Sequence, residues 1–351
     1  MFKKHVCILL ILVLVMLIVF AGIIVIVDPF FHYHEPNEIF GYIFCNARYQ
    51  NYGIAKNFDY DAIITGTSMT ENFKSTEFDE LFDVTSIKTS FSGEALRGIS
   101  DYLKFALNEN SEVKYVITSL DFYSIMSDKN ALSYSDYPTY LYDYNILNDV
   151  NYVLNKSVML SVVSRVLMNT QVEMNYVTTF DEYTNWSDYY SYGIEAVLNT
   201  YERGELSADV HEFTEGEKNA VYDNLQQNIV SLALENPSVE FYLFIPPYSI
   251  AWFDSMFISG EMQKNIEVLE YVTSILLECE NVNIYSFFDE YEMICNLDNY
   301  KDTVHYNEDI NSQILIWMHN EEHLLASDNY EEYFNEISDF YLNYDYDAIW
   351  E

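Results

Sequence analysis

Basic residues are scarce in this chain of 351 residues. Lys and Arg together number 16 against 56 Asp and Glu, which gives a formal net charge of -40. A protein that binds nucleic acid needs a cationic surface, so this composition argues against that class. Half of the residues are nevertheless hydrophobic and 17% are aromatic. That balance is typical of a folded protein with one large domain or two small ones, and it excludes wholesale disorder.

Cysteines and metal-binding patterns are also few. The four cysteines include no C-x-x-C pair, which excludes a disulfide-built miniprotein and the usual zinc modules. Cys279 and Cys295 are candidates for a disulfide bond, which the sequence alone leaves open. No calcium loop of the D-x-[DN]-x-[DN]-G type is present. We therefore expect no metal ion and no cofactor.

An uncharged run of 22 residues extends from Val6 to Val27. A helix rises about 1.5 Å per residue, so this run spans about 33 Å and can cross the ~30 Å core of a bilayer. A cleavable signal peptide is the alternative, but its apolar core has only about 7–15 residues. We predict a retained single-pass anchor in the lipid bilayer over residues 6–27. Lys3 and Lys4 precede the run and Asp28 follows it, so the rest of the chain should be extracytoplasmic.

Short apolar runs alternate with helical patterns after the anchor. Strands are expected at 61–66, 84–88, 115–120, 241–245 and 282–285, and helices at 95–107, 218–234, 266–277 and 310–325. This alternation predicts βαβ units, and hence an α/β fold with a parallel sheet and helices on both faces. Ligands bind such sheets at the carboxyl ends of the strands, so the loops at that edge are the ones to search.

One long segment, residues 122–214, interrupts the alternation. It is rich in Tyr, Asp, Asn and Ser, and a connection of this length is seldom a bare loop. We expect an inserted lid subdomain within a domain of residues 59–325. Residues 28–58 would form a stem and residues 326–351 an acidic tail. The tyrosines of the insertion could form a sugar-stacking wall, but we favour biased composition as their explanation.

The first expected strand ends in the turn Gly66-Thr67-Ser68-Met69. A serine on a sharp strand-to-helix turn exposes its hydroxyl at the edge of the sheet, with its own N–H directed toward any oxyanion that forms there. Ser68 is therefore a candidate nucleophile. Taken alone, a Thr-Ser pair before a helix is more often an ordinary N-cap.

A second motif, Asp302-Thr303-Val304-His305, follows the last expected strand. An Asp three residues before a His can turn back onto the imidazole and hold its Nδ1–H, which leaves Nε2 to accept a proton. The sheet model places this loop at the same edge as Ser68. The two motifs together predict that Ser68 and His305 lie within hydrogen-bond distance.

These residues resemble the SGNH/GDSL hydrolase superfamily, whose sheet is flavodoxin-like. The resemblance covers about residues 59–317, and it includes Gly93 in Ser90-Phe91-Ser92-Gly93 after the second strand. It implies that Ser68 is the nucleophile, His305 the general base and Asp302 the acid that orients it. It also implies that the N–H groups of Ser68 and Gly93 form an oxyanion hole.

The chain departs from this family at the third motif, where the family has an Asn after the third strand. Here that position reads Ser119-Leu120-Asp121-Phe122, so one oxyanion donor is missing or replaced. Losing such a donor typically costs about 10²–10³ in rate. This departure counts against hydrolysis by free water more than against the fold.

Membrane-anchored proteins of this superfamily resemble the chain still more closely. They include the D-alanyl transfer protein of teichoic-acid modification and proteins of exopolysaccharide O-acetylation. The resemblance implies extracytoplasmic transfer of an acetyl or D-alanyl group through an acyl-Ser68 intermediate to a cell-envelope polysaccharide or teichoic-acid-like polymer. It also implies a membrane-bound O-acyltransferase as partner. Two alternatives stay open: an esterase that removes acyl groups from envelope glycans, and a non-catalytic partner of the acyltransferase.

Three further motifs have competing interpretations. Pro247 and Tyr248 end a strand at the active edge, so they either bind substrate or merely stop the strand. The stretch from His319 to His323 fits the H-x-x-E-H pattern of zinc peptidases, but a solvated helix face explains it better. His32 and His34 follow the anchor, and we expect interfacial polar residues there rather than metal ligands.

Overall fold

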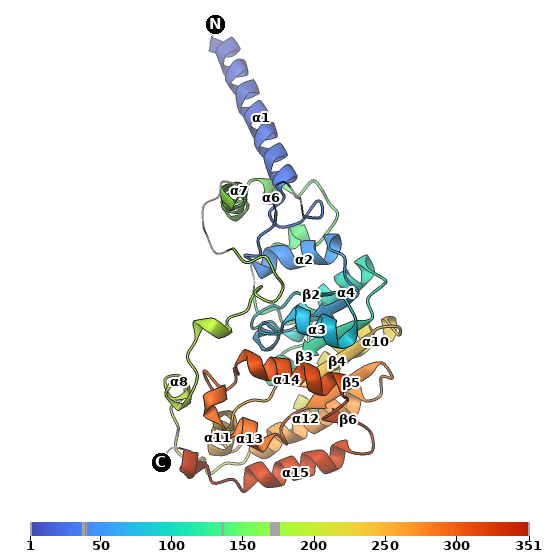
Figure 1. The fold of residues 1–351 in the computed structure, drawn as a ribbon, viewed down its shortest axis with the longest axis vertical. Helices are drawn as coiled ribbons and strands as arrows, with labels where there is room; N and C mark the ends of the chain where they lie inside the picture. The colour runs from blue at the N-terminus through green and yellow to red at the C-terminus, as the bar shows by residue number, and fades with distance from the viewer. Residues whose placement is uncertain (1, 37–38, 40, 135–136, 169–175, 350–351) are drawn as a thin grey trace. The chain divides into compact units, whose positions relative to one another are not determined.

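The computed structural model describes residues 2–36, 39, 41–134, 137–168 and 176–349 (Figure 1). Contacts within the chain divide it into two compact units. Unit 1 comprises Met1–Asp59 and Asp136–Thr179, and unit 2 comprises Tyr60–Ser135 and Phe180–Glu351. The expected insertion, residues 122–214, is therefore divided between the two units. Its proposed action as a lid stays a prediction.

Unit 2 is an α/β structure built on a sheet of six strands within the described residues, in the order β2-β1-β3-β4-β5-β6. The strands are β1 (Ala62–Ile64), β2 (Ser86–Lys88), β3 (Tyr115–Ser119), β4 (Glu240–Ile245), β5 (Val282–Ser286) and β6 (Leu324–Leu325). The first five pair in parallel, as the sequence predicts, and β6 pairs antiparallel to β5. Their mostly apolar sequences suit a sheet that is buried on both faces.

Helices cover both faces of this sheet, as the contacts of successive side chains along β4 show. Leu243 lines a small cavity with residues of α4 (Leu96–Glu109), η4 (Gln226–Val230) and α10 (Ser231–Glu235). The next side chain, Phe244, points to the other face and contacts Phe73. On that second face Tyr242 contacts Phe82 at the end of α3 (Ser75–Phe82). Successive side chains of a strand point to opposite faces, so the helices lie on both.

Helical segments account for most of the remainder of unit 2. The longer ones are α9 (Glu215–Leu225), which continues into η4 and α10, and α11 (Ile250–Ser259), α12 (Met262–Leu276), α14 (Glu308–His319) and α15 (Tyr330–Leu342). The shorter ones are η1 (Ser68–Thr70), α5 (Phe122–Ile125), η3 (Ser187–Tyr189), α8 (Ile194–Leu198), α13 (Tyr291–Ile294), η5 (Leu297–Asn299) and η6 (Tyr346–Ile349). The acidic tail thus contains helix α15, whose Phe334, Ile337 and Tyr341 are buried.

The prediction of one helix over 310–325 is wrong at its carboxyl end. Helix α14 stops at His319, and Glu321 and His323 adopt left-handed backbone conformations with φ of 58° and 60°. The chain then reverses, and Leu324 and Leu325 pair with β5. His319 and His323 therefore do not share a helix face, and His323 instead pairs with Asp289 and Glu290.

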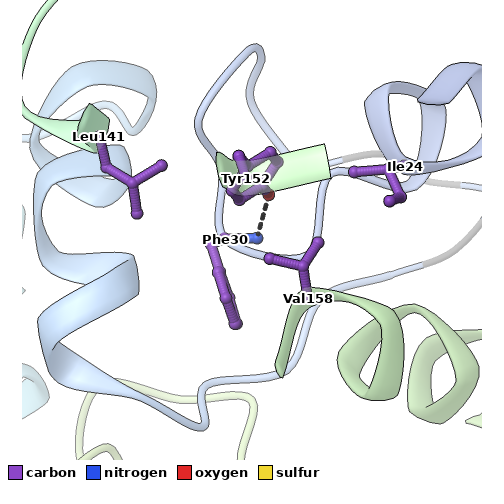
Figure 2. Close-up of a cluster of buried hydrophobic side chains, with 5 residues drawn as sticks. All are labelled: Ile24, Phe30, Leu141, Tyr152 and Val158. Atoms are coloured by element: carbon purple, nitrogen blue, oxygen red, sulfur yellow. Dashed lines mark hydrogen bonds between the residues drawn. The ribbon is translucent and has the colours of Figure 1, made fainter. Parts of the chain in front are cut away.

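Unit 1 contains the long apolar helix α1 (Phe2–Val27), which is long and apolar enough to cross a membrane (Figure 1). Its other elements are α2 (Ala47–Asn57), η2 (Thr139–Leu141), α6 (Val150–Val153) and α7 (Lys156–Met168). A hydrophobic cluster joins them: Ile24 of α1 packs with Phe30, Leu141, Tyr152 and Val158 (Figure 2). The last turn of α1 is thus part of a folded unit.

Buried polar groups fix the chain where it leaves α1. Asp28 accepts hydrogen bonds from the Tyr152 hydroxyl at 2.7 Å and from the backbone N–H of Tyr33 at 2.7 Å. The buried Arg165 guanidinium donates to the carbonyl oxygen of Pro29 at 2.6 Å and lies over the ring of Phe31. Buried polar groups need such partners, because an unmet one costs about 1–3 kcal/mol.

Candidate active site

The turn after β1 carries Ser68 at the carboxyl edge of the sheet. Gly66 makes the turn feasible: its φ is +135°, and a Cβ there would lie 2.9 Å from the Thr70 side chain and 3.0 Å from Ser119 Oγ. Thr67 caps the short helix η1, since its Oγ1 accepts a hydrogen bond from the N–H of Met69. Glycine is needed where the chain takes such a backbone conformation in so little space. The sequence therefore dictates where the Ser68 hydroxyl is presented.

The loop before α14 carries Asp302 and His305. Oδ1 of Asp302 accepts the backbone N–H groups of Val304 at 2.9 Å and His305 at 2.8 Å, which curls the loop back on itself. The carbonyl oxygen of Thr303 accepts hydrogen bonds from the N–H and the hydroxyl of Ser249 at 3.1 and 2.7 Å. Because both sides of the loop are fixed, the imidazole of His305 is held at the sheet edge.

The structure brings the three predicted triad residues together. Ser68 Oγ lies 2.8 Å from His305 Nε2, and His305 Nδ1 lies 2.7 Å from Asp302 Oδ2. The carboxylate favours the proton on Nδ1, so Nε2 accepts the hydrogen bond of the Ser68 hydroxyl. Burial opposes ionisation of Asp302, but the hydrogen bond and charge of His305 outweigh it and lower the pKa of that carboxyl. Asp302 is therefore ionised and able to stabilise an imidazolium.

An aromatic side chain from the segment 180–214 completes the surroundings of His305. The ring of Trp186 meets the imidazole edge-on at 5.4 Å between centroids, and its Nε1–H donates to the carbonyl oxygen of Ser68 at 3.4 Å. Lys301 Nζ lies 4.3 Å from the centroid of the Trp186 ring and 3.9 Å from that of Tyr190. Nothing in the sequence around Trp186 indicated this contact, because it depends on how a long connection folds back.

The two residues predicted to donate to an oxyanion, Ser68 and Gly93, line the same cavity. Gly93 has a φ of +66°, and a Cβ there would come no closer than 3.5 Å to Tyr134, so its backbone conformation, rather than space, favours glycine. Within the described residues, the N–H groups of Ser68 and Gly93 have no hydrogen-bond partner.

Asp121 occupies the place where the resemblance leads one to expect an Asn. Its Oδ2 accepts hydrogen bonds from Thr67 Oγ1 at 2.7 Å and from Ser119 Oγ at 2.5 Å. Asp121 is among the residues that line the cavity, and burial raises the pKa of its carboxyl. The neighbouring strands β1 and β3 place these three residues together.

A cavity of about 230 Å³ opens beside Ser68. It is lined by Thr67, Ser68, Met69, Gly93, Glu94, Ala95, Asp121, Tyr123, Ser124, Ser127, Ser133, Tyr248, Val304 and His305. Tyr248 thus lies where the sequence placed a substrate-binding residue. Pro247 is absent from this lining among the described residues: it is buried, and its carbonyl oxygen accepts the Tyr300 hydroxyl at 2.8 Å. Of the two residues, only Tyr248 therefore lines this cavity, and a substrate-binding role for either stays a prediction.

Other sequence candidates lie outside this site. All four cysteines are free, so Cys279 and Cys295 form no disulfide. His32 is buried in unit 1, where its Nε2 lies 3.3 Å from Asp149 Oδ1, and its expected place at a membrane interface stays a prediction. In the part of the chain that the structure describes, no cluster of His, Cys, Asp and Glu has the arrangement of a metal site.

Comparison of the chain with protein-family models, with curated proteins and with solved structures gave no match. What the fold and site define directly is an α/β protein with a mostly parallel sheet and a Ser–His–Asp arrangement at its carboxyl edge. The resemblance to SGNH hydrolases therefore depends on the motifs and geometry of this chain alone.

Proposed function

We propose that Ser68, His305 and Asp302 are a catalytic triad that transfers a short acyl group to a hydroxyl of a cell-envelope polymer. The observation that carries the proposal is the 2.8 Å contact between Ser68 Oγ and His305 Nε2, with Asp302 on the other ring nitrogen. Two loops separated by 237 residues supply these groups, at the edge where α/β sheets bind ligands. This is the arrangement that activates a serine as a nucleophile.

The reaction has two halves. His305 Nε2 takes the proton of Ser68 as Oγ attacks the acyl carbonyl, and it returns that proton to the leaving group of the donor when the tetrahedral intermediate collapses. The acceptor hydroxyl then attacks the acyl-Ser68 ester and gives its proton to His305, which protonates Ser68 Oγ as it leaves. The N–H groups of Ser68 and Gly93 are the proposed donors to the oxyanion in both halves.

The size of the cavity supports a short acyl group. Pockets that bury a drug-sized ligand usually measure about 300–1,000 Å³, whereas the cavity beside Ser68 has about 230 Å³. An acetyl or D-alanyl group fits this space better than a long fatty acyl chain does. Helix α1 supports a membrane setting, with α1 as a retained anchor, unit 2 outside the cytoplasm and a membrane-bound O-acyltransferase as the source of the acyl group.

The test uses full-length protein in its native membrane. A fluorophosphonate probe should label the wild type and Ser274→Ala, which removes a serine hydroxyl from α12, but not Ser68→Ala. Envelope acyl esters should fall in a strain that carries Ser68→Ala. A rise in esters instead would establish a deacylating esterase, and unlabelled wild type with unchanged esters would establish a non-catalytic role.

A further inference from the structure

Helix α7 has an apolar face that is exposed among the described residues of unit 1. Met159, Leu160, Val163 and Val166 are 43%, 58%, 53% and 43% exposed. Their spacing along the helix places them on one face, because residues three and four apart are neighbours on a helix surface. Val158, on the opposite side, is buried. Water is an unfavourable environment for a contiguous stripe of four large apolar side chains.

The position of α7 in unit 1 indicates what covers this stripe. Val158 belongs to the cluster that contains Ile24 of α1 (Figure 2). Phe20 of α1 packs against the same cluster. Helix α7 therefore lies beside the last two turns of the apolar helix. The preceding segment adds Ile146, Leu147, Val150 and Leu154, all of them more than half exposed. These residues add to the exposed apolar side chains of unit 1, which also include those of α1.

The charged residues in and around α7 also favour a lipid surface as its partner. Acidic residues outnumber basic ones 56 to 16 in the chain, yet none occurs between Asp149 and Glu173. Lys156, at the start of α7, is exposed, whereas Arg165 is buried and bonded within unit 1. An amphipathic helix with a bulky apolar face and basic rather than acidic residues is the type that lies in the interface of a bilayer. A protein partner would not require the exclusion of acidic residues, whereas an anionic lipid surface would favour it.

We propose that α7 lies in the bilayer interface where α1 emerges, with Met159, Leu160, Val163 and Val166 among the lipid acyl chains. The proposal depends on α1 being a retained membrane anchor, which is part of the proposed function. It gives unit 1 a second contact with the membrane, in addition to α1. Unit 1 would then be a folded structure held at the membrane surface, not an extended stem.

The test measures how strongly brominated phospholipids quench tryptophan fluorescence. The bromine atoms are on acyl-chain carbons close to the headgroup, and the full-length protein is in vesicles of phosphatidylcholine and phosphatidylglycerol. The added fluorescence of Leu160→Trp should be quenched about as strongly as that of Ile26→Trp in the last turn of α1. Leu198→Trp in α8 is half exposed in the wild type and should be unquenched. Circular dichroism establishes that each variant folds.

The outcomes separate this proposal from the anchor itself. If Leu160→Trp stays water-exposed while alkaline carbonate fails to extract the protein, the anchor holds and the interface proposal is wrong. If the tryptophan is shielded from water but not quenched by brominated lipid, a protein covers the stripe and the lipid assignment is wrong. If carbonate extracts the protein, the anchor itself fails.

A second inference concerns Asp121, a buried carboxyl that accepts hydrogen bonds from three hydroxyls. Thr67 and Ser119 both donate to Oδ2, and a carbonyl-type oxygen has two lone pairs for two such donors. A proton on Asp121 would therefore sit on Oδ1, which accepts only a long hydrogen bond, of 3.5 Å, from the Tyr248 hydroxyl. The titratable groups that face the carboxyl are His305, Tyr248 and Tyr306.

A neutral carboxyl has the shape and polarity of an amide, with one accepting oxygen and one donating edge. We propose that protonated Asp121 donates from Oδ1–H to the acyl oxygen, as the third oxyanion donor beside the N–H groups of Ser68 and Gly93. The inference depends on the proposed acyl chemistry at Ser68. Asp121 keeps its proton throughout, and it only strengthens a hydrogen bond as negative charge develops on the acyl oxygen. Burial raises the pKa of Asp121 and outweighs the hydrogen bonds from Ser119, Thr67 and Tyr248 and the nearby His305, which act to lower it.

The test compares Asp121→Asn with Asp121→Ala, with p-nitrophenyl acetate as the acyl donor and solubilised full-length protein. Asparagine keeps a donor and should retain the rate within about tenfold, whereas alanine should lower it by about 10²–10³. Asparagine should also abolish the loss of rate that the wild type shows as the pH rises through the raised pKa of Asp121. Equal loss in both variants, or an alkaline limb that persists in Asp121→Asn, would overturn the inference. Absence of any Ser68-dependent rate in the wild type would instead count against the proposed function.

Discussion

Two histidine–carboxylate pairs in this chain have similar geometry and different surroundings. In unit 2, Asp302 holds Nδ1 of His305, and Nε2 meets the Ser68 hydroxyl at the wall of a cavity. In unit 1, Asp149 contacts Nε2 of the buried His32, and its other oxygen accepts the Tyr33 hydroxyl at 3.0 Å. An imidazole next to a carboxylate is thus not by itself a catalytic site. The partner of the second ring nitrogen and access to a cavity make the difference.

The largest expected contrast comes from replacing each histidine with glutamine. His305→Gln removes the proposed base and should lower the Ser68-dependent rate by about 10⁴–10⁶, with the free energy of unfolding changed by less than about 0.5 kcal/mol. His32→Gln should keep the rate of the folded protein and lose about 1–3 kcal/mol, because Asp149 is left buried with a poorer partner. Ester hydrolysis and thermal unfolding of the solubilised full chain measure both. A His32→Gln protein that is fully stable but inactive would reverse the assignment of the two pairs.

The carboxylates allow a sharper comparison. Asp302→Asn should lower the rate by about 10³–10⁴, because an amide can stabilise the wrong tautomer of His305 and gives no charge to an imidazolium. Asp149→Asn keeps the shape of a buried group in unit 1 and should leave the rate unchanged. The measurement is the initial rate of ester hydrolysis against pH for both variants. A rate in Asp302→Asn within tenfold of the wild type would show that His305 needs no orienting acid.

Much of unit 2 could be predicted from the sequence, because the patterns that indicate its strands and turns are local. Ala62 to Ile64 and Tyr115 to Ser119 are short, apolar and followed by turn residues, so their strand character and order follow from pattern alone. Parallel strands put their carboxyl ends at one edge, so the proximity of Ser68 and His305 was predictable. The position of Asp121 beside Thr67 follows from the same geometry, since β1 and β3 are neighbours.

The rest depended on contacts that a single sequence does not encode locally. The end of α14 was mispredicted because Glu321 and His323 take left-handed conformations without any glycine to mark the turn. Trp186 lies 118 residues from the Ser68 carbonyl that it contacts, in a segment without a periodic pattern. The burial of His32 likewise depends on Asp149, which lies in a different part of the chain.

Smaller effects are expected from the aromatic side chains that lie next to the two histidine–carboxylate pairs, Trp186 beside His305 and Tyr33 beside His32. Trp186→Phe keeps a ring against His305 but removes the Nε1–H bond to the Ser68 carbonyl, which is long at 3.4 Å. We expect the rate to fall by about 3–10-fold, the equivalent of about 0.6–1.4 kcal/mol. Tyr33→Phe removes a hydroxyl from Asp149 and should lower stability without changing the rate. Equal rates in the wild type and Trp186→Phe would show that the ring alone positions His305.

The smallest effect is expected at a third pair, His323 with Asp289 and Glu290. Burial opposes the charge of His323, but the hydrogen bond to Asp289 and the nearby carboxylates outweigh it and raise the pKa of the imidazole. A raised pKa in the folded state means that the stabilisation is complete below the unfolded value of about 6.5 and disappears as the pH rises through the folded value. His323→Gln should therefore lower the free energy of unfolding by less than about 1 kcal/mol at about pH 5.5, and by nothing measurable at about pH 8.5.

Thermal unfolding at both pH values measures this difference, and substitution of the exposed His211 by Gln is the matched control. An equal loss at both pH values would mean that His323 acts through packing against Trp317 and Phe287 rather than through its charge.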